Sequence, residues 1–202
     1  MHASAVAHPN VALIKYWGKQ DVVGNIPAVG SLSLTLAGLE TRTTVYFDSS
    51  LEFDQVQING EIDQRASAQA QQCLDLLRCQ ADCNLSARIK STNNFPTAAG
   101  LASSASGYAA LVKAASAALA LDLDTVELAD IARYGSGSAA RSLYPGIVAL
   151  QLLEEEARIL IECESVASPT DWPLVVVVAI TSTQMKETGS TEGMERSRMT
   201  SP

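Results

Sequence analysis

The chain has 202 residues, a formal net charge of −8 at neutral pH and 47% hydrophobic residues. This length suffices for one sizeable core, or for somewhat more than one domain. The acidic balance argues against a general nucleic-acid binder, so any anion site must be basic locally. No uninterrupted apolar run approaches ~20 residues, which predicts no membrane span. The N-terminus lacks the pattern of a signal peptide, and this favours a cytoplasmic protein.

Four segments have the alternation or the composition of strands, namely residues 3–12, 31–36, 41–47 and 85–90. A hairpin is predicted over residues 56–62 because an Asn-Gly pair separates two short apolar runs. Leucines and a cysteine at roughly helical spacing predict an amphipathic helix over residues 65–80. Strands therefore dominate the first half of the expected fold.

Two helices are expected next. One is an Ala/Leu-rich helix over residues 105–120, and the other covers residues 124–133 with Asp124 or Thr125 as its cap. Residues 147–152 and 158–164 then predict paired strands. A single helix across both segments is the alternative, because the run is rich in good helix formers.

The last part of the chain predicts a second unit that is only begun. Glu154, Glu155 and Glu156 are expected in a solvated turn, and the polar, proline-containing residues 165–173 mark a domain boundary. We therefore divide the chain into domains at 1–168 and 169–202.

An apolar run at residues 174–180 predicts a strand buried on both faces. About 20 residues follow it, including a helix beginning near Ser190, and these are too few to cover such a strand. We expect either a longer two-domain protein or a partner that completes this one.

Cys73, Cys79, Cys83 and Cys163 form no Cys-x-x-Cys pair and are predicted to be free thiols, with metal or disulfide use as a minor alternative. His2 and His8 are the only histidines, so no His-rich metal site and no Ser-His-Asp hydrolase are expected.

Residues 93–106 form the most distinctive stretch. A polar loop runs into the Ala/Leu-rich helix through a junction made almost wholly of Gly, Ala and Ser, which lets a ligand approach the backbone closely. Free amide groups and the helix dipole make such a junction an anion site. No Gly-Lys-Ser/Thr follows, so it is not a Walker A loop. The alternative is an ordinary capped helix packed tightly on a sheet.

Two further segments carry cationic groups. Lys15 and Lys19 flank an aromatic pair before Gly18, which suits a phosphate ligand, although a solvated lysine pair is an equal alternative. Residues 134–142 form a Gly/Ser turn that opens a short helix with Arg141 one turn in. The alternative there is a helix cap with a surface ion pair.

Five segments carry a family likeness, and they are residues 10–19, 31–36, 93–106, 135–142 and 186–194. Together, and in this order, they resemble the diphosphomevalonate decarboxylase family. That family belongs to the superfamily of small-molecule kinases related to galactokinase, homoserine kinase and mevalonate kinase. The resemblance implies an α/β (α+β) fold. Its N-terminal domain would be of the ribosomal protein S5 domain 2-like type, followed by the start of a ferredoxin-like C-terminal domain.

The resemblance also implies an ATP-dependent lyase of the mevalonate pathway. Mevalonate 5-diphosphate would be phosphorylated on its 3-hydroxyl, and loss of that phosphate and of carbon dioxide would give isopentenyl diphosphate for isoprenoid biosynthesis. ATP and Mg²⁺ are the implied cofactors and the small molecule is the implied partner. A homodimer is left open, and no nucleic-acid or membrane partner is expected.

The family pattern assigns substrate contacts to Tyr16, Trp17, Gly18, Lys19, Ser136, Gly137, Ser138, Ala139, Ala140, Arg141, Ser190 and Thr191. It assigns contacts with ATP and its magnesium to Asn93, Asn94, Pro96, Ala99, Gly100, Leu101, Ala102, Ser103 and Ser104. Lys19, Ser136 and Arg141 are the implied catalytic positions, the latter two orienting the substrate carboxylate and hydroxyl. No protein ligand for a metal is assigned.

Three departures from the family pattern are visible. The family's catalytic base is an aspartate in its back half, and no acidic residue here matches that motif. Pro145, Gly146 and Ile147 stand where the family has Gly-Gly-Phe, and Gln69 stands where it often has arginine. Two alternatives therefore remain beside the decarboxylase. One is a related kinase or phosphomevalonate decarboxylase, and the other is a non-catalytic fragment or pseudoenzyme.

Overall fold

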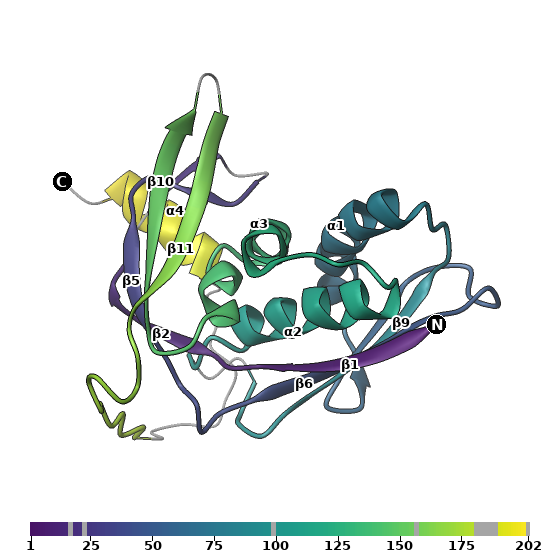
Figure 1. Ribbon diagram of the computed structural model, residues 1–202, viewed down its shortest axis with the longest axis horizontal. Helices are drawn as coiled ribbons and strands as arrows, with labels where there is room; N and C mark the ends of the chain where they lie inside the picture. The colour runs from purple at the N-terminus through teal and green to yellow at the C-terminus, as the bar shows by residue number, and fades with distance from the viewer. Residues whose placement is uncertain (16–17, 22–23, 98–99, 156–157, 180–189, 201–202) are drawn as a thin grey trace.

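The computed structural model describes residues 1–15, 18–21, 24–97, 100–155, 158–179 and 190–200 (Figure 1). It is a mixed α/β fold in which a five-stranded sheet carries helices on one face. In order across that sheet, the strands are β1 (His2–Ala7), β6 (Thr41–Phe47), β9 (Ala87–Asn93), β7 (Gln55–Ile58) and β8 (Glu61–Ile62). All neighbours are antiparallel except β7 and β9, which run parallel because helix α1 (Gln64–Ala81) crosses between them.

Helix α2 (Ser103–Ala118) lies along the sheet against β1 and β6, and α3 (Thr125–Gly135) packs across α1 and α2 (Figure 1). The alanines of α2 allow this close approach, because Ala109, Ala114 and Ala115 are fully buried. Leu74, Leu77, Ile89 and Val112 complete the main core between helices and sheet. The α2 axis is thus fixed on both sides, which fixes its N-terminal end as well.

A second, antiparallel sheet stands at the left of Figure 1. Its strands, in order, are β11 (Arg158–Ala167), β10 (Ile147–Glu155), β5 (Ser31–Thr35) and β2 (Asn10–Ile14). The short 3-10 helix η1 (Ala139–Leu143) joins α3 to β10 and contacts both α2 and β5. The second sheet is therefore tied to the helical layer through η1.

Two small elements complete the described part. Strands β3 (Lys19–Asp21) and β4 (Ile26–Pro27) form a short hairpin, and α4 (Ser190–Thr200) is the last helix along the described chain. No helix among the described residues is long and apolar enough to cross a membrane.

Most predicted elements are confirmed with shifts of a few residues at their ends. The hairpin turn has Asn59 and Gly60 at φ of 50° and 93°, as an Asn-Gly turn requires. Asp124 caps α3 through a reciprocal capping box with Glu127. Residues 147–152 and 158–164 belong to paired strands, so the alternative of one helix is wrong.

Three predictions at the level of elements are wrong. Residues 3–12 do not form one strand, because the chain leaves the first sheet at His8 and Pro9 and enters the second at Asn10. Pro9 has no amide donor for a continuous ladder. Glu154 and Glu155 are not in a turn, since β10 continues through both of them, opposite Ile159 and Arg158. Glu156 lies outside the described residues.

The third wrong prediction is the buried strand at residues 174–180. Residues 174–179 pair with no described strand, and Val175 and Val177 are 87% and 88% exposed. Ile180 lies outside the described residues. Strand composition is not sufficient here, because a strand requires a neighbour to accept its backbone hydrogen bonds.

We predict that Gly146→Ala destabilises the fold. Gly146 has φ of 78°, and a Cβ there would overlap the carbonyl oxygen of Ala167. Left-handed backbone alone costs an alanine ~1–2 kcal/mol. Urea unfolding should therefore show a midpoint clearly below that of the unmodified chain.

Gly38→Ala is the matched control, because a Cβ at Gly38 would meet no atom within 4 Å. Its midpoint should stay the same or rise slightly, since alanine restricts the unfolded chain. Equal midpoints for the two variants would contradict the prediction for Gly146.

Candidate functional site

Lys19 lies close to the C-terminal end of α3, although the two are far apart in sequence. Its ammonium donates to Asn25 Oδ1 at 2.6 Å, and Asn25 Nδ2 donates to the carbonyl of Tyr134 at 2.9 Å. Tyr134 is the penultimate residue of α3. The predicted neighbours Tyr16 and Trp17 lie outside the described residues. Gly18 is partly exposed, and its carbonyl accepts from the amide of Ala28.

Helix α3 ends where it meets the side of α2. A Cβ at Gly135 would overlap the ring of Tyr108 on α2, so glycine is the residue that this contact allows. Ser136 then adopts extended backbone, and its hydroxyl lies 3.2 Å from that of Ser138. The Gly/Ser turn predicted as an anion site is therefore held between α3, α2 and η1.

Asn10 fixes this turn from the second sheet. Its side-chain amide donates to the carbonyl of Ser138 at 3.0 Å and to Ser142 Oγ at 2.7 Å. Asn10 is only 4% exposed, so both bonds form in a setting that excludes water. The start of β2 and the start of η1 therefore move as one unit.

Arg141 is buried beneath the same turn, with 3% of its surface exposed. Its Nε donates to Ser33 Oγ at 3.0 Å and its Nη1 donates to Ser31 Oγ at 2.6 Å. The alternative of a surface ion pair is wrong, because the side chain is not at the surface. Two neutral hydroxyls fix two edges of the guanidinium without cancelling its charge.

Several assigned positions are inaccessible in this structure. Ala139 and Ala140 are fully buried and Gly137 is buried, and the amide of Ala139 donates to the carbonyl of Ser136 at 2.8 Å. Ser190 and Thr191 begin α4, and their side chains lie outside the described part. The structure thus brings together Lys19, Asn10, the Ser136 turn and Arg141.

Buried thiols near this region are not nucleophiles. Burial raises the pKa of Cys163 to about 12, with nearby Arg141 acting in the opposite direction. Burial also raises the pKa of Cys73 to about 12. Both thiols stay protonated at neutral pH, and a thiol is far less reactive than a thiolate. All four cysteines are free.

The loop before α2 is anchored by its asparagines. Asn93 Oδ1 accepts from Thr41 Oγ1 at 2.5 Å, and Asn93 Nδ2 donates to Thr97 Oγ1 at 3.2 Å. Asn94 Oδ1 accepts from the amide of Glu40 at 2.8 Å. In this structure the two amides therefore hold the loop in shape.

The junction between loop and helix has the geometry of an anion site. Gly100 and Ala102 have φ of 85° and 52°, and Ala102 is the N-cap of α2. An alanine has no side-chain acceptor for the first-turn amides, and no side-chain cap is present there. The amide of Ala105 donates to the carbonyl of Ala102 at 2.9 Å, and the amide and hydroxyl of Ser104 lie next to it at a helix N-terminus that favours an anion. Pro96 is exposed, Leu101 is partly exposed and Ala99 lies outside the described residues.

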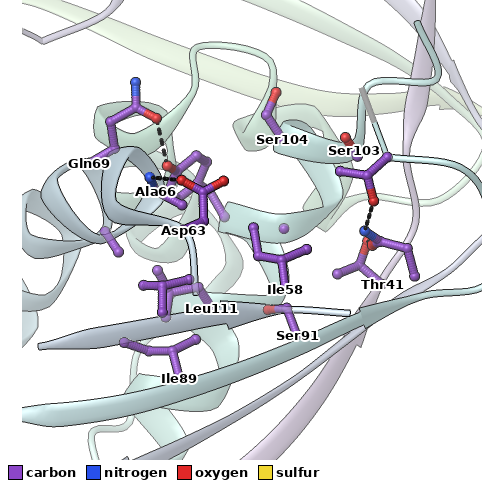
Figure 2. Close-up of a pocket in the computed structure, with 16 residues that line it drawn as sticks. Thr41, Ile58, Asp63, Ala66, Gln69, Ile89, Ser91, Ser103, Ser104 and Leu111 are labelled. Atoms are coloured by element: carbon purple, nitrogen blue, oxygen red, sulfur yellow. Dashed lines mark hydrogen bonds between the residues drawn. The ribbon is translucent and has the colours of Figure 1, made fainter. Parts of the chain in front are cut away.

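A cavity of about 210 Å³ adjoins this junction. Figure 2 shows Ser103, Ser104 and Thr41 on one side of it and Asp63 and Gln69 on the other. Apolar side chains lie between them, namely those of Val56, Ile58, Ile89 and Leu111. Gln69 Oε1 accepts from the Tyr108 hydroxyl at 2.8 Å, and burial raises the pKa of Tyr108 above its usual value.

The cavity beside the loop is not the largest hollow of the described residues. One of about 420 Å³ lies between residues 34–39 and the segment from Ser168 to Val178. The relative size of the two hollows is not visible in the sequence, because the second hollow depends on how residues 168–178 fold back over β5.

Tyr108 connects the two anion regions. Its ring packs on Gly135, one residue before the Ser136 turn. Its hydroxyl donates to Gln69 in the wall of the cavity that Ser103 and Ser104 also line. The cavity and the Lys19–Arg141 region therefore lie on neighbouring sides of one side chain. Among the described residues no cluster of three His, Cys, Asp or Glu could hold a metal.

Sequence reasoning did not single out five residues that organise this region, and they are Asn10, Asn25, Ser31, Ser33 and Arg133. Each acts through a contact with a residue about 100 or more positions away. The strict alternation of residues 31–36 placed Ser31 and Ser33 on one face, and the family likeness of the same segment was a second signal for them. The sequence alone gave no partner for that face.

The chain is similar to known proteins over nearly its whole length. Residues 7–159 match the family described as diphosphomevalonate decarboxylase-like N-terminal domain. The diphosphomevalonate decarboxylase of Candida albicans is 41% identical, and the match covers 98% of this chain and 59% of that protein. A structure of the mevalonate diphosphate decarboxylase from Enterococcus faecalis is 42% identical with a TM-score of 0.73, over 83% of this chain and 52% of that one.

A structure of MDDEF in complex with MVAPP, AMPPCP and magnesium matches with a TM-score of 0.81 and 37% identity, over 98% of this chain and 61% of that one. This match confirms the predicted α/β fold class. The chain thus spans a little over half the length of the relatives it matches.

We predict that Asn10→Ala lowers the free energy of unfolding by ~1–3 kcal/mol, because it leaves buried polar groups of Ser138 and Ser142 without their donor. Urea unfolding monitored by circular dichroism measures the change. Asn84→Ala is the control, since Asn84 is exposed and exposed sites usually change stability by less than ~0.5 kcal/mol. An Asn10 variant as stable as the control would show that the two bonds contribute nothing.

Proposed function

Because this chain belongs to the family of diphosphomevalonate decarboxylase-like N-terminal domains, we propose that it binds mevalonate 5-diphosphate and ATP for an ATP-dependent decarboxylation. The convergence of Lys19, the Ser136 turn and Arg141 at the end of α3 carries the proposal. The substrate has a diphosphate at one end and a carboxylate near the reacting carbon. A point charge suits the first group and a planar fork suits the second.

Lys19 would bind the diphosphate together with the hydroxyls of Ser136 and Ser138. Arg141 would orient the carboxylate through its guanidinium, which Ser31 and Ser33 hold in place. Tyr16, Trp17, Gly18, Gly137, Ala139, Ala140, Ser190 and Thr191 are proposed as further substrate contacts, by analogy with the family. Ala139 and Ala140 are fully buried in this structure, so they would act by supporting the turn.

ATP would lie across the loop and the cavity beside it. Its phosphates would meet the amides after Gly100 and the hydroxyls of Ser103 and Ser104, where a helix N-terminus favours negative charge. Its base would enter the mostly apolar cavity of about 210 Å³. Asn93, Asn94, Pro96, Ala99, Leu101 and Ala102 shape this loop. The magnesium ion, when bound, neutralises phosphate charge during transfer.

The chemistry follows from this placement. Transfer of the γ-phosphoryl group to the 3-hydroxyl converts a poor leaving group into a good one. The C3–O bond then breaks, and the electrons of the bond between the carboxylate carbon and C2 form the new double bond as carbon dioxide leaves. Arg141 keeps the carboxylate in position for this step. The base that takes the hydroxyl proton is, by family resemblance, an aspartate that none of these 202 residues matches.

A ligand-binding protein without turnover is the second candidate, and the unmatched aspartate favours it for the chain as it stands. A monophosphate substrate and a related small-molecule kinase remain open as well. We also propose that residues 1–168 form the ATP- and substrate-binding domain and that residues 169–202 begin another. We also propose that the protein is located in the cytoplasm.

We predict that the 202-residue chain binds mevalonate diphosphate and AMPPCP–magnesium but releases no carbon dioxide from mevalonate diphosphate and ATP. Loss of a positioned base typically costs ~10²–10⁴ in rate. Calorimetry measures binding, and carbon dioxide and ADP are followed in parallel. Turnover at ~1 s⁻¹ or more, which is typical of enzymes, would show that the base lies within this chain. Failure to bind either ligand would contradict the proposed function.

We predict that Arg141→Lys weakens binding of mevalonate diphosphate about tenfold or more, because a charge-assisted hydrogen bond contributes ~1.5–3 kcal/mol. Binding of inorganic pyrophosphate, which has no carboxylate, should be unchanged. Arg88→Lys, at an exposed position on β9, is the matched control. Equal loss for both ligands would show that Arg141 supports the fold and not the carboxylate.

A further inference from the structure

The Lys19 ammonium is oriented by a neutral side chain. Asn25 accepts from Lys19 Nζ at 2.6 Å through Oδ1 and donates to the Tyr134 carbonyl at 2.9 Å through Nδ2. One amide thus connects the cation to the last turn of α3. The next residues of the chain are the Ser136 turn, which Asn10 fixes from the other side.

Arg133 holds the rest of this hairpin on α3. Its Nη1 donates to the carbonyl of Gly24, and its guanidinium lies 4.2 Å from the centroid of the Tyr134 ring. Its Nε donates to Asp130 Oδ1 at 2.7 Å on the preceding turn of the same helix. Only 7% of Arg133 is exposed. The side chain is therefore a rigid part of α3 and not a flexible surface group.

The backbone of the turn fits this arrangement. Asn25 has φ of 53°, a left-handed conformation that asparagine adopts more readily than most residues. A Cβ at Gly24 would lie 2.6 Å from Asp21 Oδ2 and 2.8 Å from Arg133 Nη1, so glycine leaves room for both groups. Glycine at position 24 and asparagine at position 25 are thus the two residue types that this contact with α3 favours.

We propose that Asn25 is a positioning residue that fixes the Lys19 ammonium relative to the last turn of α3, just before the Ser136 turn. An aspartate in the same place would also accept from Lys19. It would add a negative charge close to the anion. This inference rests on the proposed role of Lys19 in diphosphate binding.

The test compares Asn25→Gly, Asn25→Asp and Lys19→Ala for binding of inorganic pyrophosphate and of AMPPCP–magnesium by calorimetry. Glycine keeps the left-handed backbone and removes the amide, so pyrophosphate binding should weaken several-fold. Asn25→Asp should weaken it further, by tenfold or more, although it preserves the shape of asparagine and an acceptor for Lys19. Binding of AMPPCP–magnesium should stay the same in all three variants. Gln57→Ala is the control, since Gln57 is an amide that supports a distant hairpin turn.

A double-mutant comparison separates positioning from general stability. If Asn25 acts through Lys19, then Asn25→Gly should cause no further loss of pyrophosphate binding when Lys19 is already alanine. Additive losses would overturn the inference. Unchanged pyrophosphate binding in Asn25→Gly, together with weak binding in Lys19→Ala, would overturn the inference and leave the proposed function intact. Unchanged binding in Lys19→Ala would overturn the proposed role of Lys19 itself.

A readout without ligand keeps the inference testable if pyrophosphate binds weakly. Side-chain ¹⁵N spectra of the unmodified chain should resolve the Lys19 ammonium, because its hydrogen bond to Asn25 slows proton exchange with water. In Asn25→Gly this resonance should exchange faster and broaden. Identical Lys19 resonances in the two proteins would show that Asn25 does not hold the ammonium.

Discussion

The close approach of α3 to α2 at Gly135 is the constraint on which the candidate site depends. The missing side chain of Gly135 allows the ring of Tyr108 to lie against the end of α3. The same helical end presents the Tyr134 carbonyl to Asn25 and begins the Ser136 turn. A shift of α3 along α2 would therefore move Lys19 and Ser138 together. Relative positions within the site are thus set by one helix end and not by several independent loops.

Neutral side chains are among the partners of both cations in this region. Ser31 and Ser33 bind the buried guanidinium of Arg141, and Asn25 binds the ammonium of Lys19. A carboxylate would hold either group more tightly, but it would also lower the affinity for an anionic ligand by offsetting the charge. By contrast, Arg78 meets the carboxylate of Asp54 at 2.5 Å, away from the site. Burial lowers the pKa of Arg78, and Asp54 more than restores it. That pairing suits a structural ion pair.

Local patterns in the sequence were sufficient for most elements. Alternation predicted β5, a composition rich in Thr, Val and aromatic residues predicted β6, the Asn-Gly pair predicted the β7–β8 turn, and Asp124 predicted the start of α3. The errors fall where an outcome depends on distant partners. His8 and Pro9 change sheets because the second sheet offers β5 as a neighbour, and residues 174–179 remain unpaired because no described strand lies alongside them. Composition carries no information about either circumstance.

The candidate site was predictable to a similar extent and for the same reason. Residue type identified Lys19, Arg141 and the loop at Gly100 as groups suited to anions. It could not identify Asn10, Asn25 or Arg133, whose roles arise from contacts across more than a hundred residues. The family likeness supplied ligand assignments, but it did not show which contacts hold each side chain in place. Those contacts are visible only in the folded structure.

The two candidate anion regions offer different physical means of recognising charge. The loop before α2 offers backbone amides at an N-terminus whose cap is Ala102, and amides of this kind bind any oxyanion that fits between them. The region at the end of α3 offers two side chains with distinct shapes, a point charge and a planar fork. In the proposed function, the first region would suit a phosphate chain that must move during transfer. The second would distinguish the two ends of one substrate, because α3 and η1 fix the spacing between Lys19 and Arg141.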